Sequence, residues 1–453
     1  MSDAPLTLAE ATQQLTAPGQ IFETERATVL GREMTVWKHA PANLRQLLDA
    51  SLAHSEKDFI VYEERRFTFD QHYRIAATVA QRLLDLGVAK GDRGAIAARN
   101  LPEWIMAFWG SVVMGAVSVP LNAWWTTNEL LYGLTDSGSS VLFVDEERFE
   151  RIRGELDALP ALRTIVVMSE HLATPAPLGE VPSHVRVERF WDFVGDVAAD
   201  ATPPDVVIDT DDDLSIMYTS GTTGHPKGAM STHRNSVSNL MNLGFAAQRA
   251  ALRFGGAVTS RGQNAGLLNV PLFHTTGLHA FMVPSTAAGG KVVMMHHFDA
   301  AKALKIIEEE HIGLIGGVPT IAMQILDHPD FAKFDTSSVT SVSYGGAPPP
   351  PGLAQRLATA FPLASPGNGY GLTETTAAVC GNSGLDYLAK PDSCGVAYPI
   401  NEVAILPYYI ANLNIEFTYK QRTGKYAINR TIPTRRIIRE YFVVSHDAKQ
   451  LFN

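Results

Sequence analysis

The sequence predicts an α/β fold in which crossover helices cover a mostly parallel sheet. Short β-like runs alternate with helical stretches along most of the chain, as such a sheet requires. The 453 residues are 45% hydrophobic and 19% charged, enough to bury a large core divided between more than one subdomain. The chain shows no internal repeat and no coiled-coil heptads.

The first predicted elements are a helix, a hairpin and a second helix. The first helix has an apolar stripe at Leu44, Leu47, Leu48 and Leu52. Residues 59–69 are typical of a hairpin that turns at 63–66. The second helix is expected to bury Tyr73, Ala76, Ala80, Leu83 and Leu84, and Gly87 stands where a left-handed C-terminal cap would fit.

Two series of αβ units follow. In the first, strands are expected at 94–98, 140–144 and 164–168, with helices at 101–114 and 146–156. Segments 173–182 and 198–204, rich in Pro and Ala, are predicted surface connections, and 214–218 is the next strand. In the second series, strands are expected at 291–294, 312–315 and 339–344, with helices at 300–310 and 320–326.

Segment 218–228, YTSGTTGHPKG, follows a predicted strand and is suited to holding phosphate. Gly221 and Gly224 permit backbone conformations in which successive N–H groups converge on an anion. The hydroxyl donors are Thr219, Ser220, Thr222 and Thr223, and Lys227 adds a positive charge. An ordinary P-loop has its closing glycine directly before Lys and Ser/Thr, so a P-loop NTPase is not expected. A plain Gly/Thr surface turn is the alternative interpretation.

Composition argues against several other classes of function. The formal net charge of −10 disfavours nucleic acid as a partner of the whole chain but allows small anionic cofactors. Neither a signal sequence nor an apolar run long enough for a bilayer is evident, so a cytoplasmic location is expected. Cys380 and Cys394, the only cysteines, lack metal-ligand spacing and are expected to be ordinary thiols. Nothing in the chain indicates an oligomeric state.

Together with three further motifs, the loop resembles the signature of the adenylate-forming (AMP-binding) enzymes, which include acyl-CoA synthetases, luciferases and peptide-synthetase adenylation domains. The further motifs are NVPLFHTTGL at 269–278, YGGAPPP at 344–350 and NGYGLTE at 368–374. The resemblance implies an acyl-CoA-synthetase-like large N-terminal domain, residues 1–406, with two αβ subdomains and a distorted β-barrel. In the family, the active site faces a small mobile C-terminal domain.

The same resemblance assigns roles to individual residues. Asn368 and Tyr370 would hold the adenine, while Gly345, Gly346 and Ala347 would line the adenine and the acid. Thr219 and Glu374 would hold Mg²⁺, a cation that prefers hard oxygen ligands. Lys227, Thr373, Glu374 and His274 are the candidate catalytic residues, with Thr373 at the α-phosphate and His274 at the mouth of the acid pocket. The candidate cofactor-binding residues are Thr219, Ser220, Gly221, Thr222, Thr223, Gly224, Lys227, Gly345, Gly346, Ala347, Asn368, Tyr370, Gly371 and Thr373.

The chemistry that the resemblance implies is a two-step ligation with ATP, Mg²⁺ and coenzyme A. A carboxylate attacks the α-phosphorus of ATP to give an acyl-adenylate and pyrophosphate, and a thiol then displaces AMP. Such a site supplies alignment and charge neutralisation rather than a nucleophile. A medium- or long-chain fatty acid is the expected substrate from the apolar PLFHTTGL segment, with aryl acids as the alternative.

Other prominent residues have simpler interpretations. His274 could instead be a hydrogen-bonded core residue, and His225 is expected to have no catalytic role. His296 and His297 are expected at the surface, because no partner ligands stand at zinc-site spacing. The aromatic patch Trp104, Trp109, Trp124 and Trp125 is expected to pack in the core, although some of these rings could border the acyl channel.

The family resemblance ends near Ile405, where the composition changes. Residues 407–453 carry eight Lys/Arg and three Asp/Glu, which marks a compositional boundary. The family's ribose-binding Thr-Gly-Asp segment and catalytic C-terminal lysine are not recognisable there, so the small C-terminal domain is expected to be absent. Residues 406–426 instead resemble a fragment of restriction-system adenine DNA methyltransferases, without that family's catalytic motif, as a gene fusion or frameshift would produce.

A truncated ligase is expected to bind nucleotide and to adenylate its acid slowly, with the thioester step impaired more. Two alternatives remain open at this point. One is a catalytically dead nucleotide-binding pseudoenzyme. The other is a DNA-associated module that acts through the basic tail.

Overall fold

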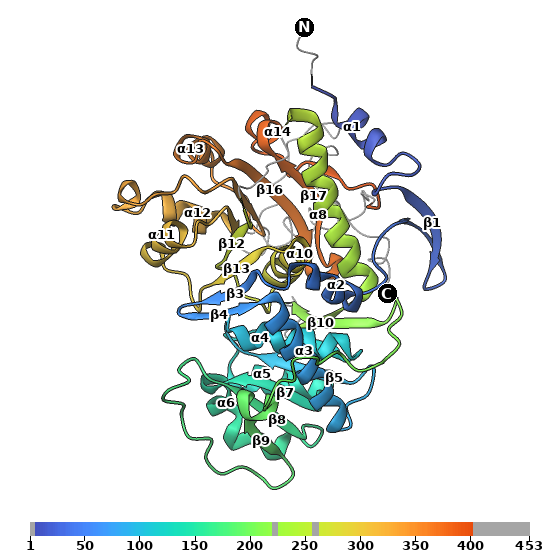
Figure 1. Cartoon of the computed structure of the whole chain (residues 1–453), viewed down its shortest axis with the longest axis vertical. Helices are drawn as coiled ribbons and strands as arrows, with labels where there is room; N and C mark the ends of the chain where they lie inside the picture. The colour runs from blue at the N-terminus through green and yellow to red at the C-terminus, as the bar shows by residue number, and fades with distance from the viewer. Residues whose placement is uncertain (1–4, 220–224, 256–261, 402–453) are drawn as a thin grey trace, which may run out of the picture.

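The computed structural model describes residues 5–219, 225–255 and 262–401, which form two lobes, each built around one large sheet (Figure 1). The first sheet has seven strands in the spatial order β11 (Lys227–Thr232), β10 (Asp213–Thr219), β6 (Val117–Pro120), β5 (Arg93–Ala97), β7 (Val141–Asp145), β8 (Thr164–Met168) and β9 (Arg186–Arg189). All neighbouring pairs are parallel except β10 with β11, which form an antiparallel hairpin.

The second sheet has nine strands. Their spatial order is β18 (Val396–Ala397), β17 (Ala377–Ser383), β16 (Ser365–Leu372), β15 (Ser341–Gly345), β14 (Leu314–Gly317), β12 (Ala265–Leu268), β13 (Lys291–Met294), β3 (Asp58–Tyr62) and β4 (Arg65–Thr68). Its central strands, from β16 to β3, run parallel. Their carboxyl ends therefore lie along one edge, where open α/β sheets bind ligands.

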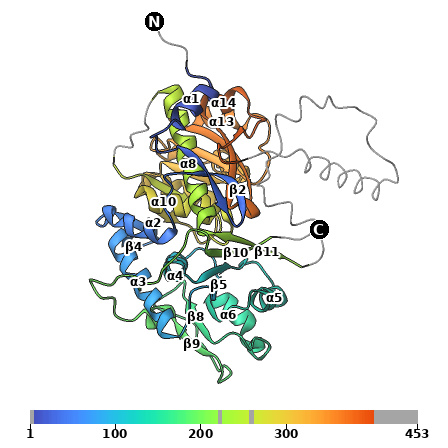
Figure 2. The same ribbon diagram turned by 90° about the vertical axis from the view of Figure 1, so that its right-hand side faces the viewer.

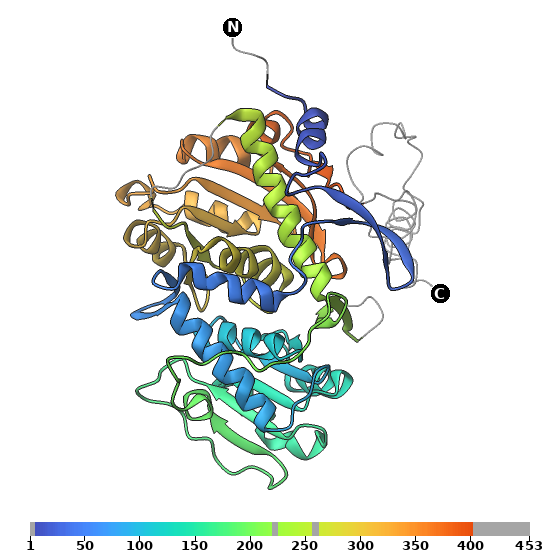
Figure 3. The same cartoon turned by 45° about the vertical axis from the view of Figure 1, so that its right-hand side comes forward.

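The first lobe carries helices α3 (Phe69–Asp85), α4 (Pro102–Val113), α5 (Thr127–Ser137), α6 (Glu146–Ile152) and α7 (Phe190–Val194). The second carries α2 (Leu44–Ala50), α8 (His233–Phe254), α9 (Thr275–Gly277), α10 (Val283–Ala288), α11 (Ala300–Glu309), α12 (Pro319–Leu326), α13 (Leu353–Ala360) and α14 (Gly384–Ala389). Helix α1 (Leu8–Leu15) and the hairpin of β1 (Thr24–Val29) and β2 (Arg32–Trp37) flank the long α8 (Figure 3).

Helix α4 joins the two lobes through a shared hydrophobic core. All of its residues are buried, and Trp104 and Trp109 are fully enclosed, as expected for a helix that is apolar on every side. The same core cluster contains Val166 from the first sheet and Val292 from the second. The hairpin of β10 and β11 lies between the lobes (Figure 2). The predicted phosphate loop connects the two paired strands of this hairpin.

The predicted α/β fold with two αβ subdomains is confirmed, with local differences. The predicted hairpin at 59–69 is β3 and β4, and Gly87 has the left-handed φ of +77° that its capping role requires. Leu84 is 40% exposed, because it is rotated about 100° around the helix from the buried Leu83. Strand β14 begins two residues later than expected, and the helix expected at 146–156 changes to a 3₁₀ helix at Arg153.

Candidate functional site

A cavity of about 400 Å³ lies where the carboxyl ends of strands from both sheets approach each other. Segments that directly follow β12, β13, β14 and β15 form one wall, and segments that follow β5 and β6 form the other. The lining residues used below are Arg99, Asn100, Trp124, Asn269, Phe273, His274, Thr276, His296, His297, Val318, Ile321 and Gly346. The position and the largely apolar lining suit a small organic substrate.

Asn100 fixes the two walls relative to each other. Its amide Nδ2 donates to the carbonyl oxygens of Val270 at 2.9 Å and Met295 at 3.3 Å, and its Oδ1 accepts from the Leu272 N–H at 2.9 Å. One buried side chain of the first lobe thus holds the segments that follow β12 and β13 in the second. No motif in the sequence points to this asparagine. It lies in the short connection between β5 and α4, two residues before the proline that begins the helix.

The predicted adenine-binding residues lie on the paired ends of β15 and β16. In this parallel ladder Asn368 pairs with Tyr344 and Gly369 pairs with Gly345. A Cβ on Gly345 would lie 2.7 Å from the carbonyl oxygen of Gly369, so the two backbones approach closely only because a side chain is missing. Gly346, with a φ of +74°, then turns the chain into the cavity wall.

Tyr370 continues along β16 toward the predicted α-phosphate and Mg²⁺ residues. It packs against the cluster that Val379 and Cys380 form, as Cys394 does. Burial raises the pKa of the Tyr370 phenol, and the neighbouring thiols and the Glu374 carboxylate add to the shift, so the phenol stays neutral. The next turn requires Gly371, since a Cβ there would meet the Ala377 carbonyl oxygen at 1.6 Å.

The Thr373–Thr375 turn packs against the β10–β11 hairpin, where the predicted phosphate loop begins and ends. A buried hydrogen bond of 2.7 Å between the hydroxyls of Ser231 and Thr376 joins the two. Thr376 has a φ of +52°, a conformation that β-branched residues rarely adopt. The structure therefore brings the segment with Thr373 and Glu374 to the hairpin, with Glu374 exposed.

Thr219 and Lys227 are register partners at the loop end of this hairpin. The hydroxyl of Thr219 donates to the Lys227 carbonyl oxygen at 3.4 Å, and the Lys227 side chain is exposed. The His225 ring stacks on Tyr132 with centroids 4.8 Å apart, and the Tyr132 hydroxyl donates to the Pro226 carbonyl. The predicted loop residues Ser220, Gly221, Thr222, Thr223 and Gly224 lie outside the described residues.

His274 begins helix α9 at the edge of the cavity. Its Nδ1 accepts a hydrogen bond of 3.2 Å from the backbone N–H of Thr276. Although part of the ring is exposed, surrounding protein desolvates it and lowers the pKa of the imidazole. A neutral ring, held through Nδ1, therefore lies at the edge of the cavity. Ala347 is exposed one residue beyond Gly346.

One expectation about this region was wrong. Trp124 does not pack in the core: it is 59% exposed and meets Phe273 edge to face, with centroids 5.2 Å apart, at the cavity. His297 is exposed, as expected, whereas His296 is partly buried, and both line the same cavity because β13 ends at its edge. Burial lowers the pKa of His296, whose Nδ1 lies 3.4 Å from Glu170. Such placements depend on which strand ends meet, and spacing within one segment does not show that.

Asn269 is a further lining residue that the sequence analysis missed. It is only 7% exposed, and neither atom of its amide has a hydrogen-bond partner among the described residues. An unpaired amide in a largely apolar wall is costly. It adds to the polar lining that Arg99, Asn100, Thr276 and the histidines provide.

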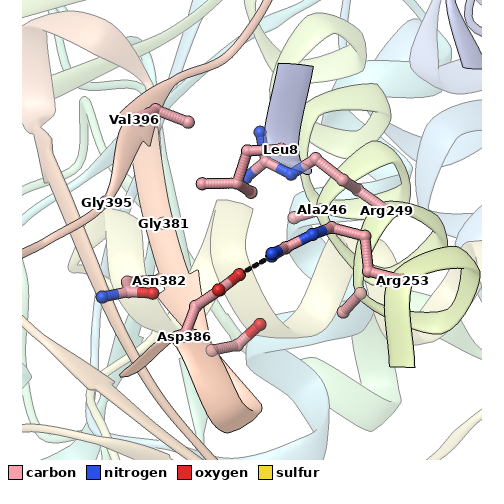
Figure 4. A pocket seen from close by; sticks show the side chains of 11 residues that line it. Leu8, Ala246, Arg249, Arg253, Gly381, Asn382, Asp386, Gly395 and Val396 are labelled. Atoms are coloured by element: carbon pink, nitrogen blue, oxygen red, sulfur yellow. Dashed lines mark hydrogen bonds and ion pairs between the residues drawn. The ribbon is translucent and has the colours of Figure 1, made fainter. Parts of the chain in front are cut away.

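A second, smaller cavity lies away from these residues, between α1, α8, β17 and α14. Figure 4 shows the ion pair of Arg253 and Asp386 crossing it, beside Gly381 and Gly395. Its volume of about 30 Å³ has room for water but not for a substrate. Across the described ranges, no helix is long and apolar enough to cross a membrane, and no cluster of three or more His, Cys, Asp or Glu could hold a metal ion.

Comparison with known proteins identifies the family of the chain. A family model described as AMP-binding enzyme matches residues 48–407. Feruloyl-CoA synthase from Amycolatopsis sp is 33% identical over 332 residues, which cover 73% of this chain and 59% of that protein. Long-chain-fatty-acid–CoA ligase FadD13 from Mycobacterium tuberculosis is 33% identical over 344 residues, which cover 75% of this chain and 61% of that protein.

Among solved structures, the N-terminal domain of FACL13 from Mycobacterium tuberculosis superimposes with a TM-score of 0.65 at 29% identity. The match covers 81% of this chain and 84% of that domain. The chain therefore spans less than two thirds of the length of the two curated relatives but most of the length of this domain.

Proposed function

Because the chain belongs to the AMP-binding enzyme family, we propose that it activates a carboxylic acid with ATP and transfers the acyl group to the thiol of coenzyme A. The observation that carries this proposal is the cavity bounded by His274 and Gly346. It opens beside the β15–β16 ladder that carries Asn368 and Tyr370. An acid in the cavity would have its carboxylate near a nucleotide on that ladder.

The residues are proposed to act by binding and orienting. Asn368 and Tyr370 would hold the adenine, and the close-packed backbone at Gly345 and Gly346 would admit it to the strand ends. Thr373 would bind the α-phosphate, and Lys227 with the loop at 220–224 would neutralise the leaving pyrophosphate. The carboxylate oxygen then forms a bond to the α-phosphorus as the bond to pyrophosphate breaks. Attack of the thiol on the acyl carbon releases AMP.

The side chains proposed for Mg²⁺ fit a hard cation. Thr219 offers a hydroxyl and Glu374 an exposed carboxylate. Thr219 is the last residue of β10, and Glu374 belongs to the Thr373–Thr375 turn, which contacts that strand. With the triphosphate, such a cation would supply charge neutralisation. Titrating Mg²⁺ into the chain with ATP tests this assignment, since Glu374→Ala should weaken the dependence of ATP binding on Mg²⁺.

For the acid we propose a medium- or long-chain fatty acid. The support is the largely apolar lining, which includes Val318, Ile321 and Phe273. Relatives of similar identity are named for an aromatic acid and for long-chain fatty acids, so aryl acids belong in any test. We also propose that residues 1–406 form the AMP-binding domain and that 407–453 are a separate basic segment, which limited proteolysis should release.

The test is mass-spectrometric detection of acyl-AMP after incubation of the full chain with Mg·ATP and a panel of fatty and aryl acids. Lys227→Ala and Glu374→Ala should each lower the rate by about 10²- to 10³-fold. Lys305→Ala and Glu309→Ala are matched controls, because these residues are 64% and 56% exposed on α11, away from the site. The chain spans 59% of the length of feruloyl-CoA synthase, so it need not carry out both steps of the reaction. The acyl-adenylate and the thioester are therefore measured separately.

Each outcome has a distinct meaning. An adenylate that needs Lys227 and Glu374 but not Lys305 or Glu309 supports the proposal and identifies the acid. ATP binding without an adenylate from any acid would contradict it and indicate a nucleotide-binding protein without ligase activity. Salt-dependent retardation of DNA by the full chain, with no ATP binding, would favour a role for the basic segment instead.

A further inference from the structure

The only two cysteines of the chain lie side by side behind the proposed adenine-binding tyrosine. Cys380 Sγ is 3.5 Å from Cys394 Sγ. Cys380 belongs to β17 and is 1% exposed, whereas Cys394 lies two residues before β18 and is partly exposed. The sequence predicts ordinary thiols at both positions, because two cysteines without metal-ligand spacing indicate neither a disulfide framework nor a metal site.

The backbone around the pair is held tightly. Cys380 and Gly381 pair with Ala397 and Val396 in the antiparallel β17–β18 ladder. A Cβ on Gly395 would lie 2.1 Å from the Gly381 carbonyl oxygen, so the segment just after Cys394 touches β17 directly. Figure 4 labels Gly381, which lies in β17, and Gly395, which directly precedes β18. The thiols are therefore kept together by a close strand contact, rather than by a flexible loop.

A disulfide requires a modest further approach. A disulfide bond is about 2.0 Å long, so the two sulfur atoms need to approach by roughly 1.5 Å. The Cys394 side chain, on an irregular segment with partial exposure, can supply this movement more readily than Cys380 inside the sheet. A hydrogen bond from Cys380 lowers the pKa of Cys394 to about 7, which favours the reactive thiolate on the accessible partner.

The pair is coupled to the proposed nucleotide site through Tyr370. Tyr370 is the register partner of Cys380 in the β16–β17 ladder, and both Tyr370 and Cys394 pack against the cluster that Val379 and Cys380 form. Drawing Cys394 toward Cys380 would change the packing of this cluster beside Tyr370. The adenine would then meet a less well supported tyrosine.

We propose that Cys380 and Cys394 are a thiol-oxidation site, and that their disulfide weakens ATP binding by displacing the support behind Tyr370. The second half of this inference rests on the proposed function. Hydrogen peroxide is the oxidant. The Cys394 thiolate attacks one peroxide oxygen, forming an S–O bond as the O–O bond breaks, and the other oxygen leaves as water after protonation. Cys380 then attacks that sulfur, the S–S bond forms, and the sulfenic oxygen leaves as water.

The experiment uses the full chain, treated with hydrogen peroxide or with dithiothreitol and then alkylated with N-ethylmaleimide. Intact mass should show a monomer that has lost two hydrogen atoms and takes up no maleimide after oxidation, and two maleimides after reduction. Calorimetric titration should show ATP binding roughly threefold to tenfold weaker for the oxidised chain, the effect of losing a few side-chain contacts. Dithiothreitol should restore the affinity.

Cys380→Ser and Cys394→Ser are the controls, since neither can form the disulfide. Both should bind ATP as the reduced chain does, and peroxide should not weaken that binding. Two maleimides on the peroxide-treated chain, or a disulfide between two chains, would overturn the oxidation site. An intramolecular disulfide with unchanged ATP affinity would overturn the coupling to Tyr370. A reduced chain that binds no ATP would instead overturn the proposed function and the coupling with it.

Discussion

Gly345→Ala tests whether the β15–β16 ladder positions Asn368 and Tyr370, the proposed nucleotide-binding residues. The added Cβ would lie 2.7 Å from the Gly369 carbonyl oxygen, whereas ordinary contacts begin near 3.4 Å. Both atoms belong to paired strands, so neither can rotate away as a flexible side chain would. The strands must separate by several tenths of an ångström, and Asn368 and Tyr370 lie on either side of the contact.

Overpacking of this kind costs about 1–3 kcal/mol. If the separation moves Asn368 and Tyr370, the cost appears as a loss of ATP affinity of about 5-fold to 140-fold, because each 1.4 kcal/mol is a factor of about ten. If it leaves these two residues in place, the cost appears as a lower free energy of unfolding instead. Titration calorimetry with ATP and urea unfolding of the same sample together measure both effects.

Gly313→Ala is the matched control. Gly313 precedes β14 in the same sheet, and the nearest atom to its added Cβ, the Thr340 hydroxyl oxygen, would lie at an ordinary 3.5 Å. This variant should keep the ATP affinity and nearly all of the stability. If Gly345→Ala matched Gly313→Ala in both measurements, the close ladder would not position the nucleotide site.

The remaining predictions concern other parts of the molecule. His72 is fully buried, and burial lowers its pKa to about 3. The unfolded chain protonates this imidazole near pH 6.5, whereas the folded chain does so only near pH 3. The free energy of unfolding should therefore decrease as the pH is lowered from 6.5 to 3, by up to about 1.4 kcal/mol per pH unit, and His72→Phe should reduce that slope in urea titrations. Trp124→Ala should change the preference among acids and the KM for the acid in adenylation assays, because the ring lies exposed at the cavity. The free energy of unfolding should change by less than about 0.5 kcal/mol. An unchanged preference among acids would argue against a contact between Trp124 and the acid. Ser231→Ala should lower the free energy of unfolding in urea by about 1–3 kcal/mol, because it leaves the buried Thr376 hydroxyl without its hydrogen-bond partner. A double-mutant cycle with Thr376→Val that showed no coupling between the two positions would refute this explanation.

The sequence predicts the fold well because hydrophobic periodicity reports local structure. Strands such as 164–168 and 291–294 were located to the residue, since their buried runs are short and bounded. Errors fall where burial depends on a partner element. Leu84 continues an apolar pattern but faces outward, and β9 lacks an apolar run because it is an edge strand.

The site was predictable in part for a similar reason. His274, Gly346 and Tyr370 came from motifs, and the structure brings their segments to one edge of one sheet. Asn100 and Trp124 come from the other lobe, and only the meeting of two sheets places them at the cavity. The contact between Cys380 and Cys394 likewise depends on the return of the chain between β17 and β18, which no local pattern encodes.

The most direct test of the central claim is an isotope experiment on the full chain. The acid that forms an adenylate is supplied with ¹⁸O in its carboxylate, together with Mg·ATP and coenzyme A, and the AMP produced is weighed by mass spectrometry. If the carboxylate attacks the α-phosphorus, one ¹⁸O atom remains with the phosphate of AMP when the acyl group leaves. AMP without label, or ADP and phosphate as the products, would contradict adenylation as the chemistry of this site.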